Sequence, residues 1–428
     1  MTHTKKVAVI GAGIVGVATA IWLQRDGYQV TLIDKQGPAA GTSFGNGGVL
    51  ASCAAVPVTG PGLIRKAPRM LLDPAQPLFL KWRYLPRLLP WLTRYLRHAN
   101  AADTRRIAKA IAGVTTDSLA EHQSLADGTI AARWIIPSDY IYAYKDQAAF
   151  AADSFAWDIR QALGFRWDLW DSAAFSAYDP VFSPDLGFAV CMGNHGRIAD
   201  PGAYVKDLAR HFERQGGTLH IGAVTDILRT AGDVSGVQVD GTVIPCDIAV
   251  LTAGVWSKTL AAALGLHIPM ETERGYHLDL WAPSVMPKAP VMIAGGKFVA
   301  TPMDGRLRLA GIVEFGGLDA APSRPPFALL KRNIRKAIPG LTWDHATEWM
   351  GHRPAPADSI PVIGEVPGIK GVYAGFGHHH IGLTSGPKTG RLLAQIVAGK
   401  KPNLDLSAYS PARYASDGQQ DPDVKLGD

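Results

Sequence analysis

The apolar pattern is clearest in the first 34 residues, where two strand patterns flank a helical one. A β-branched run at 7–10 predicts a buried strand, and an apolar helical pattern then continues through Leu23 and stops at Gly27. A second strand pattern covers 28–33 and ends at Asp34. Two buried strands joined by a helix are typical of a βαβ unit with a parallel sheet.

The turn between the first strand and the helix carries three spaced glycines, Gly11, Gly13 and Gly16. At these positions the first glycine permits a tight turn, the second lets the backbone approach a pyrophosphate, and the third lets helix and strand pack closely. The N-terminus of the helix attracts phosphate groups. Asp34, at the end of the second strand, is placed to accept a hydrogen bond from a ribose hydroxyl. The unit therefore predicts an adenine dinucleotide site.

A second stretch of regular pattern begins at Asp200-Pro201, which predicts the start of a helix that runs through Arg214 and stops at Gly216-Gly217. Short strand patterns separated by glycine-containing turns come next: 218–221, 224–229, 234–239, 242–245 and 248–254. This block predicts a return of the chain to the nucleotide-binding sheet.

The remaining pattern predicts a second sheet and one more helix. Residues 140–144 have strand character, and 265–345 are expected to be mostly strand, most clearly at 273–278 and 306–313. A final helix is expected from about Pro387 to Val397. The pattern therefore favours two interleaved domains.

The uncharged residues 7–24 follow Lys5 and Lys6, which is also the pattern of a secretory signal. The apolar region of such a signal is usually about 7–15 residues long and needs no spaced glycines, so we exclude this interpretation. The uncharged stretch 36–64 is rich in Gly and Pro and predicts loop rather than a membrane span. We therefore expect no targeting segment. Three widely spaced cysteines, Cys53, Cys191 and Cys246, are typical of a reducing cytoplasm.

Charge is distributed unevenly along the 428 residues. The formal net charge is +6, yet 61–110 alone holds eleven Lys/Arg against two Asp, so the rest of the chain is slightly acidic. Within this basic segment Leu88, Trp91, Leu92, Tyr95 and Leu96 fall at helical spacing. Such a helix can lie on an anionic membrane surface or pack its apolar stripe on a protein core. Both interpretations stay open, and we expect no nucleic-acid binding because no nucleic-acid motif accompanies the charge.

Four segments together resemble the D-amino acid oxidase/dehydrogenase superfamily of FAD-dependent oxidoreductases, with most likeness to bacterial D-amino acid dehydrogenase small subunits. They are the glycine motif, the loop Thr42-Ser43…Asn46-Gly47-Gly48, Arg274-Gly275-Tyr276 and the block 351–384. The resemblance implies an α/β fold, α+β overall, in which a Rossmann-like FAD-binding domain is interleaved with a mixed-sheet substrate-binding domain. The expected FAD-binding parts are 1–85, 195–264 and 346–428, and the expected substrate-binding parts are 86–194 and 265–345.

The resemblance also implies which residues hold non-covalent FAD. They are Gly11, Gly13, Ile14, Val15, Gly16, Asp34, Lys35, Ser43, Asn46, Gly47, Gly48, Val224, Ala253, Gly254, Gly377, His378, Gly382, Leu383 and Thr384. Asp34 replaces the glutamate usual in the family, which shortens the reach by one methylene group. The run of three histidines that begins at His378 also departs from the family pattern, so the roles of His379 and His380 stay open.

The implied reaction is oxidation of a D-amino acid to a 2-oxo acid and ammonia, with hydride transfer from Cα to flavin N5. Orientation of the substrate is then the main task of the protein. Arg353 is the expected carboxylate clamp, because a guanidinium binds a carboxylate through two parallel hydrogen bonds. Tyr276 is a second expected donor to that carboxylate, and His380 an expected contact of substrate or flavin. The helix near Pro387 is expected to direct its N-terminus at the flavin and stabilise the charge of the reduced ring. We expect no metal.

Several alternatives are weighed against this function. A disulfide reductase would need a second glycine motif and a redox cysteine pair, and the sequence shows neither. Glycine or sarcosine oxidase and D-hydroxyproline dehydrogenase are related alternatives, and a non-catalytic flavin-binding subunit is an alternative of another class. The basic segment weakly favours a quinone or respiratory electron acceptor over oxygen. The basic segment 61–110 could also contact the inner face of the cytoplasmic membrane. The expected location is therefore the cytoplasm, and whether the protein binds that membrane face stays an open question.

Overall fold

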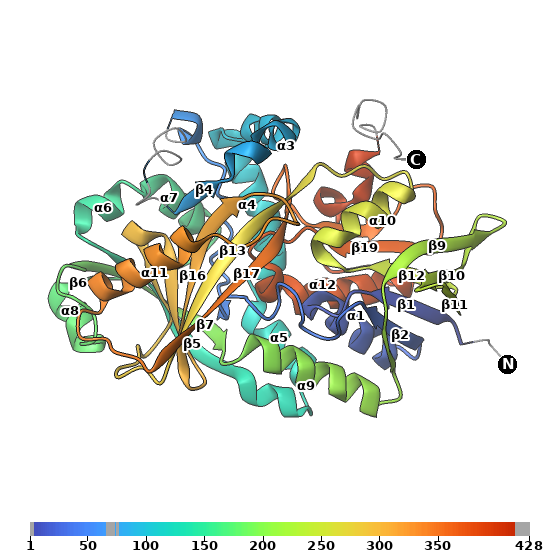
Figure 1. Ribbon diagram of the computed structural model, residues 1–428, viewed down its shortest axis with the longest axis horizontal. Helices are drawn as coiled ribbons and strands as arrows, with labels where there is room; N and C mark the ends of the chain where they lie inside the picture. The colour runs from blue at the N-terminus through green and yellow to red at the C-terminus, as the bar shows by residue number, and fades with distance from the viewer. Residues whose placement is uncertain (1–3, 66–72, 74–76, 416–428) are drawn as a thin grey trace.

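The computed structural model describes residues 4–65, 73 and 77–415. Two large sheets lie side by side, with a ten-stranded sheet at the left of Figure 1 and a six-stranded sheet at the right. Each sheet is assembled from segments far apart in the sequence, so the chain crosses between them several times.

The six-stranded sheet contains the predicted βαβ unit. Its strand order is β18-β19-β12-β1-β2-β8, parallel except between β18 and β19. The strands are β1 (Lys6–Ile10), β2 (Gln29–Asp34), β8 (Thr218–Ile221), β12 (Ile248–Leu251), β18 (Val362–Glu365) and β19 (Val372–Phe376). β9 (Val224–Thr230), β10 (Asp233–Val239) and β11 (Thr242–Pro245) form a separate three-stranded sheet. The strands expected over 6–34 and 218–251 are therefore confirmed.

The ten-stranded sheet has the order β17-β13-β16-β15-β14-β5-β7-β3, with β4 beside β16 and β6 beside β7. Its strands are β3 (Val49–Leu50), β4 (Leu78–Leu80), β5 (Ile135–Tyr144), β6 (Asp168–Asp171), β7 (Phe188–Ile198), β13 (Met270–Trp281), β14 (Val291–Ile293), β15 (Phe298–Met303), β16 (Arg306–Phe315) and β17 (His345–Pro356). β3, β4 and most of β17 fall in parts expected to bind FAD, yet they pair within this sheet.

The helices cover both sheets (Figure 1). They are α1 (Ile14–Arg25), α3 (Leu85–Arg97), α4 (Ala101–Thr115), α5 (Ser118–Ala126), α6 (Gln147–Ala151), α7 (Ser154–Ala162), α8 (Ser172–Tyr178), α9 (Pro201–Arg214), α10 (Ser257–Ala263), α11 (Arg324–Ala337) and α12 (Gly382–Val397). α9 begins where expected, because the Asp200 side chain accepts a hydrogen bond from the N–H of Ala203. Among the described residues, no helix is long and apolar enough to cross a lipid bilayer.

Two helices differ from the expectation. α11 lies within 265–345, which was expected to be mostly strand; its buried face, including Leu330 and Ile334, packs on the ten-stranded sheet. α12 begins at Gly382 rather than near Pro387. Pro387 has no N–H to donate to the carbonyl of Leu383, four residues earlier. Instead, His122 Nε2 lies 2.9 Å from that carbonyl oxygen, so the helix continues through the proline.

The basic segment forms α3, whose apolar stripe packs against the ten-stranded sheet. Leu88, Trp91 and Tyr95 are buried with Phe315 and residues of β17, and Trp91 Nε1 donates a hydrogen bond to the carbonyl of Ala355. The packed-helix interpretation is thus confirmed for these three residues. Lys66, Arg69, Leu71 and Leu72 of the same segment lie outside the described residues.

Candidate active site

A cavity of about 1160 Å³ is lined by residues from both large sheets and from α3. It runs from the turn after β1 to the side chains of β13, β17 and the histidine run. Every site residue expected from the sequence lines this cavity except Gly16, Gly48 and Gly377. The structure therefore brings together the nucleotide motif and the expected substrate residues, which are more than 250 positions apart in the chain.

The glycine turn has the geometry that the motif predicts. Gly11 has φ +108°, and a methyl group there would lie 2.6 Å from the Cα of Ala253, just after the adjoining strand β12. A methyl group at Gly16 would lie 1.8 Å from the carbonyl oxygen of Gly11. Gly16 therefore allows close packing of α1 on the turn, which is why it does not itself reach the cavity.

Asp34 and Ser43 hold the backbone around this turn. The Asp34 carboxylate accepts hydrogen bonds from the N–H groups of Ala12, Gln36 and Gly37, at 2.8 to 3.0 Å. The Ser43 hydroxyl oxygen accepts one from the N–H of Ile14 at 3.0 Å. A carboxylate has about four acceptor positions, and a hydroxyl that accepts can still donate. Both side chains therefore retain capacity for a ribose or phosphate group.

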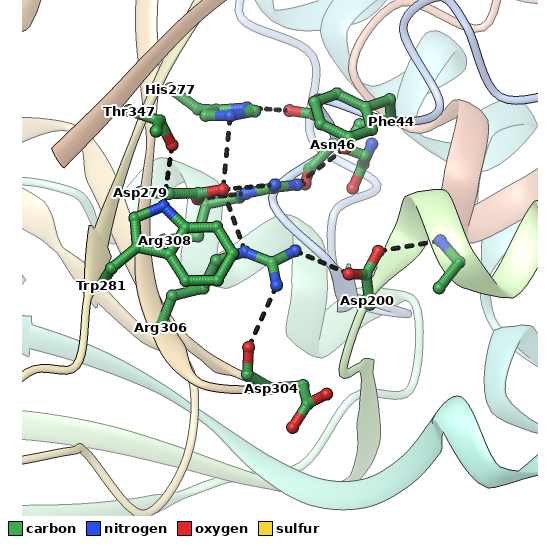
Figure 2. A network of polar contacts seen from close by, with 12 residues as sticks. Phe44, Asn46, Asp200, His277, Asp279, Trp281, Asp304, Arg306, Arg308 and Thr347 are labelled. Atoms are coloured by element: carbon green, nitrogen blue, oxygen red, sulfur yellow. Dashed lines mark hydrogen bonds and ion pairs between the residues drawn. The ribbon is translucent and has the colours of Figure 1, made fainter. Parts of the chain in front are cut away.

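The loop at 44–46 is held by charged side chains of the ten-stranded sheet (Figure 2). One guanidinium nitrogen of Arg308 donates to the carbonyls of Phe44 and Asn46, each at 2.8 Å. The Asp279 carboxylate in turn pairs with Arg308 at 2.7 Å and with Arg306 at 3.0 Å. The loop that approaches the expected flavin is therefore fixed by side chains of β13 and β16.

His277 completes this support, although the sequence analysis assigned it no role at the site. Burial and the nearby positive charge of Arg308 lower the pKa of His277 to about 3, so its ring is neutral. Its Nδ1 lies 3.0 Å from the carbonyl oxygen of Gly45, which can only accept, so Nδ1 carries the proton. The ring stacks on Trp349 with centroids 5.0 Å apart.

Sequence reasoning did not single out Asp279, Arg306 or Arg308. The signal was present as polar or charged residues at every second position of strand patterns that are otherwise apolar, at 277 and 279 and at 306 and 308. Charged side chains on one face of a buried strand need partners of opposite charge. The acidic position 279 and the basic positions 306 and 308 are therefore candidates to pair with each other.

Arg353 lies on β17 opposite Glu273 of β13, and its guanidinium occupies the space beside Gly275. Burial lowers the pKa of Arg353 while the Glu273 carboxylate raises it, and an arginine remains charged throughout. Within the described part of the chain, no residue forms a hydrogen bond or ion pair with this guanidinium. An enclosed cation whose donors face a cavity is suited to bind an anionic ligand group.

Tyr276 does not take the role expected of it. The residue follows Gly275 on β13, so its side chain projects from the opposite face of the strand. Its hydroxyl donates to Glu314 at 2.6 Å and accepts from the N–H of Ser323 at 2.9 Å, and its ring packs against Phe327 of α11. The expectation of a second carboxylate donor at Tyr276 is corrected: the hydroxyl is committed to the packing of α11.

The three histidines differ in environment. His378 is buried, with Nε2 3.0 Å from the hydroxyl of Thr389, and burial lowers its pKa to about 4. His379 Nε2 lies 3.2 Å from Oε1 of Glu273, while its Nδ1 lies 3.1 Å from Nδ1 of His380. His380 is the exposed member of the run and lines the cavity. Glu273 was expected only as part of a strand, so its contact with the histidine run was missed.

The family follows from a direct comparison of sequence. Residues 6–396 match the family described as FAD dependent oxidoreductase, abbreviated DAO. The chain belongs to this DAO family. Its cofactor is FAD, and the protein is an oxidoreductase with a mixed α/β fold.

Relatives match over nearly the whole chain. A D-amino-acid oxidase from Bradyrhizobium diazoefficiens is 35% identical over 421 residues, which cover 97% of this chain and 100% of the relative. A D-amino acid dehydrogenase from Xanthobacter autotrophicus is 29% identical over 96% of this chain and 99% of the relative. Among solved structures, glycine oxidase from Geobacillus kaustophilus has a TM-score of 0.73 at 20% identity, with 96% and 99% covered. L-proline dehydrogenase from P. horikoshii has a TM-score of 0.73 at 18% identity, with 97% and 99% covered.

The DAO-family cofactor fits the residues of this cavity. A methyl group at Gly13 would come within 3.2 Å of the Ser43 hydroxyl, so this glycine keeps the backbone open toward the start of α1. The N–H groups in the first turn of α1 have no partners within the helix and favour phosphate. The start of α12, at Leu383 and Thr384, also lies on the cavity wall. The assignment of individual residues to parts of FAD stays a prediction.

Proposed function

We propose that the protein oxidises D-amino acids to 2-oxo acids and ammonia. The observation that carries this proposal is the Arg353 guanidinium, which lines the cavity and has no hydrogen-bond or ion-pair partner among the described residues, although the Glu273 carboxylate is near enough to raise its pKa. A guanidinium in this state binds a carboxylate in a fixed orientation, and orientation supplies much of the rate in such reactions. The names of the two curated relatives support D-amino acids as the substrate class.

In this mechanism the chain binds and orients while the cofactor carries the redox chemistry. Arg353 holds the substrate carboxylate, and the loop at 44–46, fixed by Arg308 and His277, keeps the cofactor side of the cavity in place. FAD, when bound, supplies the acceptor for the Cα hydride. The imine product then hydrolyses in water to the 2-oxo acid and ammonia.

The cavity wall favours substrates with an apolar side chain. Leu88, Leu92 and Leu96 of α3 line the cavity together with Phe315 and Val313 of β16. Burial of apolar side-chain surface contributes about 25 cal/mol per Å². We therefore expect glycine and sarcosine, which lack such a side chain, to be poorer substrates than larger D-amino acids. D-hydroxyproline remains the second candidate because its ring is largely apolar.

For the electron acceptor we propose a quinone or another respiratory carrier, with peripheral membrane contact through 61–110. The exposed Trp82 and Leu89 lie among the basic residues Arg83 and Arg87, a combination suited to an anionic lipid surface. A flotation assay with vesicles containing anionic lipid tests this contact. Lack of binding at low salt contradicts it.

The experiment that tests the function is anaerobic loss of the visible flavin absorbance. The purified holoprotein is mixed with D- and L-amino acids, D-proline, D-hydroxyproline, glycine and sarcosine. We expect loss with D-enantiomers, then fast recovery with a quinone and slow recovery in air. If no amine reduces the intact flavin, the proposed function fails and the non-catalytic subunit becomes the better account.

A further inference from the structure

We propose that Glu273, His379 and His380 form a proton relay that takes the proton of the substrate ammonium group. The proposal rests on the proposed function, since it assumes an amino acid bound through Arg353. It assigns His380 as a catalytic base and gives Glu273 and His379 the role of holding the charge that the base receives.

The three side chains form one continuous path from the protein interior to the cavity. Glu273, on β13, is 4% exposed and lies beside the Arg353 strand. His379 Nε2 is 3.2 Å from Glu273 Oε1, an ion-pair contact, and the two Nδ1 atoms of His379 and His380 are 3.1 Å apart. His380 lines the cavity and is the exposed member of the path.

The backbone places His379 for this purpose. His379 has φ +51°, the left-handed region that a residue with a side chain adopts at a cost of about 1–3 kcal/mol. Its N–H donates to the carbonyl of Pro354 at 2.9 Å, which fixes the histidine run to β17 directly beyond Arg353. The strained turn therefore links the base to the strand of the carboxylate clamp.

The contacts determine where the protons lie before reaction. Burial raises the pKa of Glu273, but the contacts with His379 and Arg353 outweigh it and hold the pKa below its usual value, so the carboxylate is ionised. Nε2 of His379 lies within ion-pair distance of this carboxylate, although without hydrogen-bond geometry, and the negative charge favours the tautomer with the proton on Nε2. In that neutral ring Nδ1 accepts. His380 must then donate from Nδ1. Its Nε2 keeps a lone pair, which is the basic site of the relay.

The step moves two protons and no electrons. The ammonium group of the substrate gives a proton to Nε2 of His380, and the Nδ1 proton of His380 passes to Nδ1 of His379. The substrate is left as the neutral amine, whose lone pair is needed for Cα–H cleavage. His380 ends neutral in its other tautomer, and His379 ends as an imidazolium beside Glu273.

Electrostatics explains why a relay is needed rather than a single base. The exposed surface of His380 borders the cavity, yet the surrounding protein still removes water from the ring; this desolvation and the positive charge of Arg353 lower the pKa of His380, so a charge held on His380 itself is unfavourable. Moving the charge to His379 places it against the Glu273 carboxylate. The other titratable group that faces Glu273 is Tyr95 of α3, whose pKa burial and Glu273 raise well above 10, so it stays neutral.

The test compares His380→Ala with wild type, using His345→Ala, an exposed histidine remote from the cavity, as the control. In wild type we expect kcat/KM to be level across neutral pH. In His380→Ala we expect it to be lower there and to rise about tenfold per pH unit until the free substrate loses its ammonium proton. Added imidazole restores activity at neutral pH, because the ring it replaces borders the cavity. FAD content and the flavin spectrum show that the variant is folded.

Two further measurements separate the relay from a structural pair. Glu273→Gln keeps the shape but removes the charge that stabilises the His379 imidazolium, so kcat falls while KM for the substrate carboxylate changes little. Nitrogen-15 NMR of labelled histidine, assigned by loss of signals in His380→Ala, is expected to show His380 protonated at Nδ1. An unchanged pH profile without imidazole rescue overturns the relay, as does an Nε2-protonated His380. Failure of every amino acid to reduce wild-type flavin instead overturns the proposed function.

Discussion

Gly275 leaves the space that the Arg353 guanidinium occupies: a methyl group at position 275 would lie 2.6 Å from Cζ of Arg353. The flexible arginine would move before the strand does, so Gly275→Ala displaces the carboxylate clamp. We expect a rise in KM of at least tenfold with little change in FAD content or thermal stability. Gly340→Ala, where no atom lies within 4 Å of the added methyl group, is the control. Unchanged KM in Gly275→Ala would show that the clamp lies elsewhere.

Removal of the guanidinium tests the clamp directly. Loss of one partner of an enclosed charge pair costs about 3–5 kcal/mol, which corresponds to roughly 10²- to several 10³-fold in affinity. We therefore expect Arg353→Leu to raise KM by about this factor while FAD stays bound. Steady-state kinetics and the flavin spectrum measure the two effects, with the exposed Arg332→Leu as the control. Wild-type kinetics in Arg353→Leu contradict the assignment.

The network around Asp279 makes the cofactor loop depend on the ten-stranded sheet (Figure 2). Arg308→Met removes both hydrogen bonds to the carbonyls of Phe44 and Asn46 and one partner of Asp279. We expect FAD affinity to fall at least tenfold, measured by titration of the apoprotein with FAD, together with a loss of stability of about 3–5 kcal/mol.

The matched control for this loop is Arg413→Met. Arg413 pairs with Asp358 at 2.8 Å and donates to carbonyls of 360 and 361, so its loss also removes a partly buried ion pair. It does not contact the loop at 44–46. Equal loss of FAD affinity in both variants would mean that Arg308 acts through stability alone.

The sequence predicted best where local pattern decides structure. The βαβ unit and the strands β8 to β12 follow from short-range hydrophobic periodicity and glycine turns, and these were confirmed. The role of Tyr276 was predicted wrongly because it depends on which element packs against its face of β13. That element is α11, which the sequence pattern did not predict. The start of α12 could not be predicted, because the partner that replaces the missing proline bond is His122, 261 positions away.

The same limit applies to the charged groups at the site. The alternating polar positions in the two strand patterns point to buried charges, but the pairing of Asp279 with Arg308 follows only once β13 and β16 are known to be neighbours. The link between Glu273 and His379 requires the pairing of β13 with β17 and the left-handed turn at 379. Pairing between strands of low sequence separation is readable from turns, whereas pairing across the sheet is not.

His122 gives the last prediction, which concerns stability and pH. Burial lowers the pKa of His122 from 6.5 to about 4, and the neutral ring donates from Nε2 to Leu383 and accepts at Nδ1 from the Tyr204 hydroxyl. Above pH 6.5 the ring is neutral in both the folded and the unfolded state. Below pH 6.5 only the unfolded state takes up the proton, so stability falls until the folded pKa near 4 is reached.

We therefore expect the free energy of unfolding to fall by about 1.4 kcal/mol per pH unit from this group between those two pKa values. His122→Leu removes this contribution to the slope. At pH 7 the same variant loses about 1–3 kcal/mol, since the Leu383 carbonyl beside Pro387 is left without its donor. Urea unfolding at pH 5 and pH 7 measures both effects, with His345→Asn as the exposed control. If the free energy of unfolding changed with pH equally in His122→Leu and wild type, His122 would be protonated in the folded protein. The group that donates to the Leu383 carbonyl in α12 would then be a charged imidazolium.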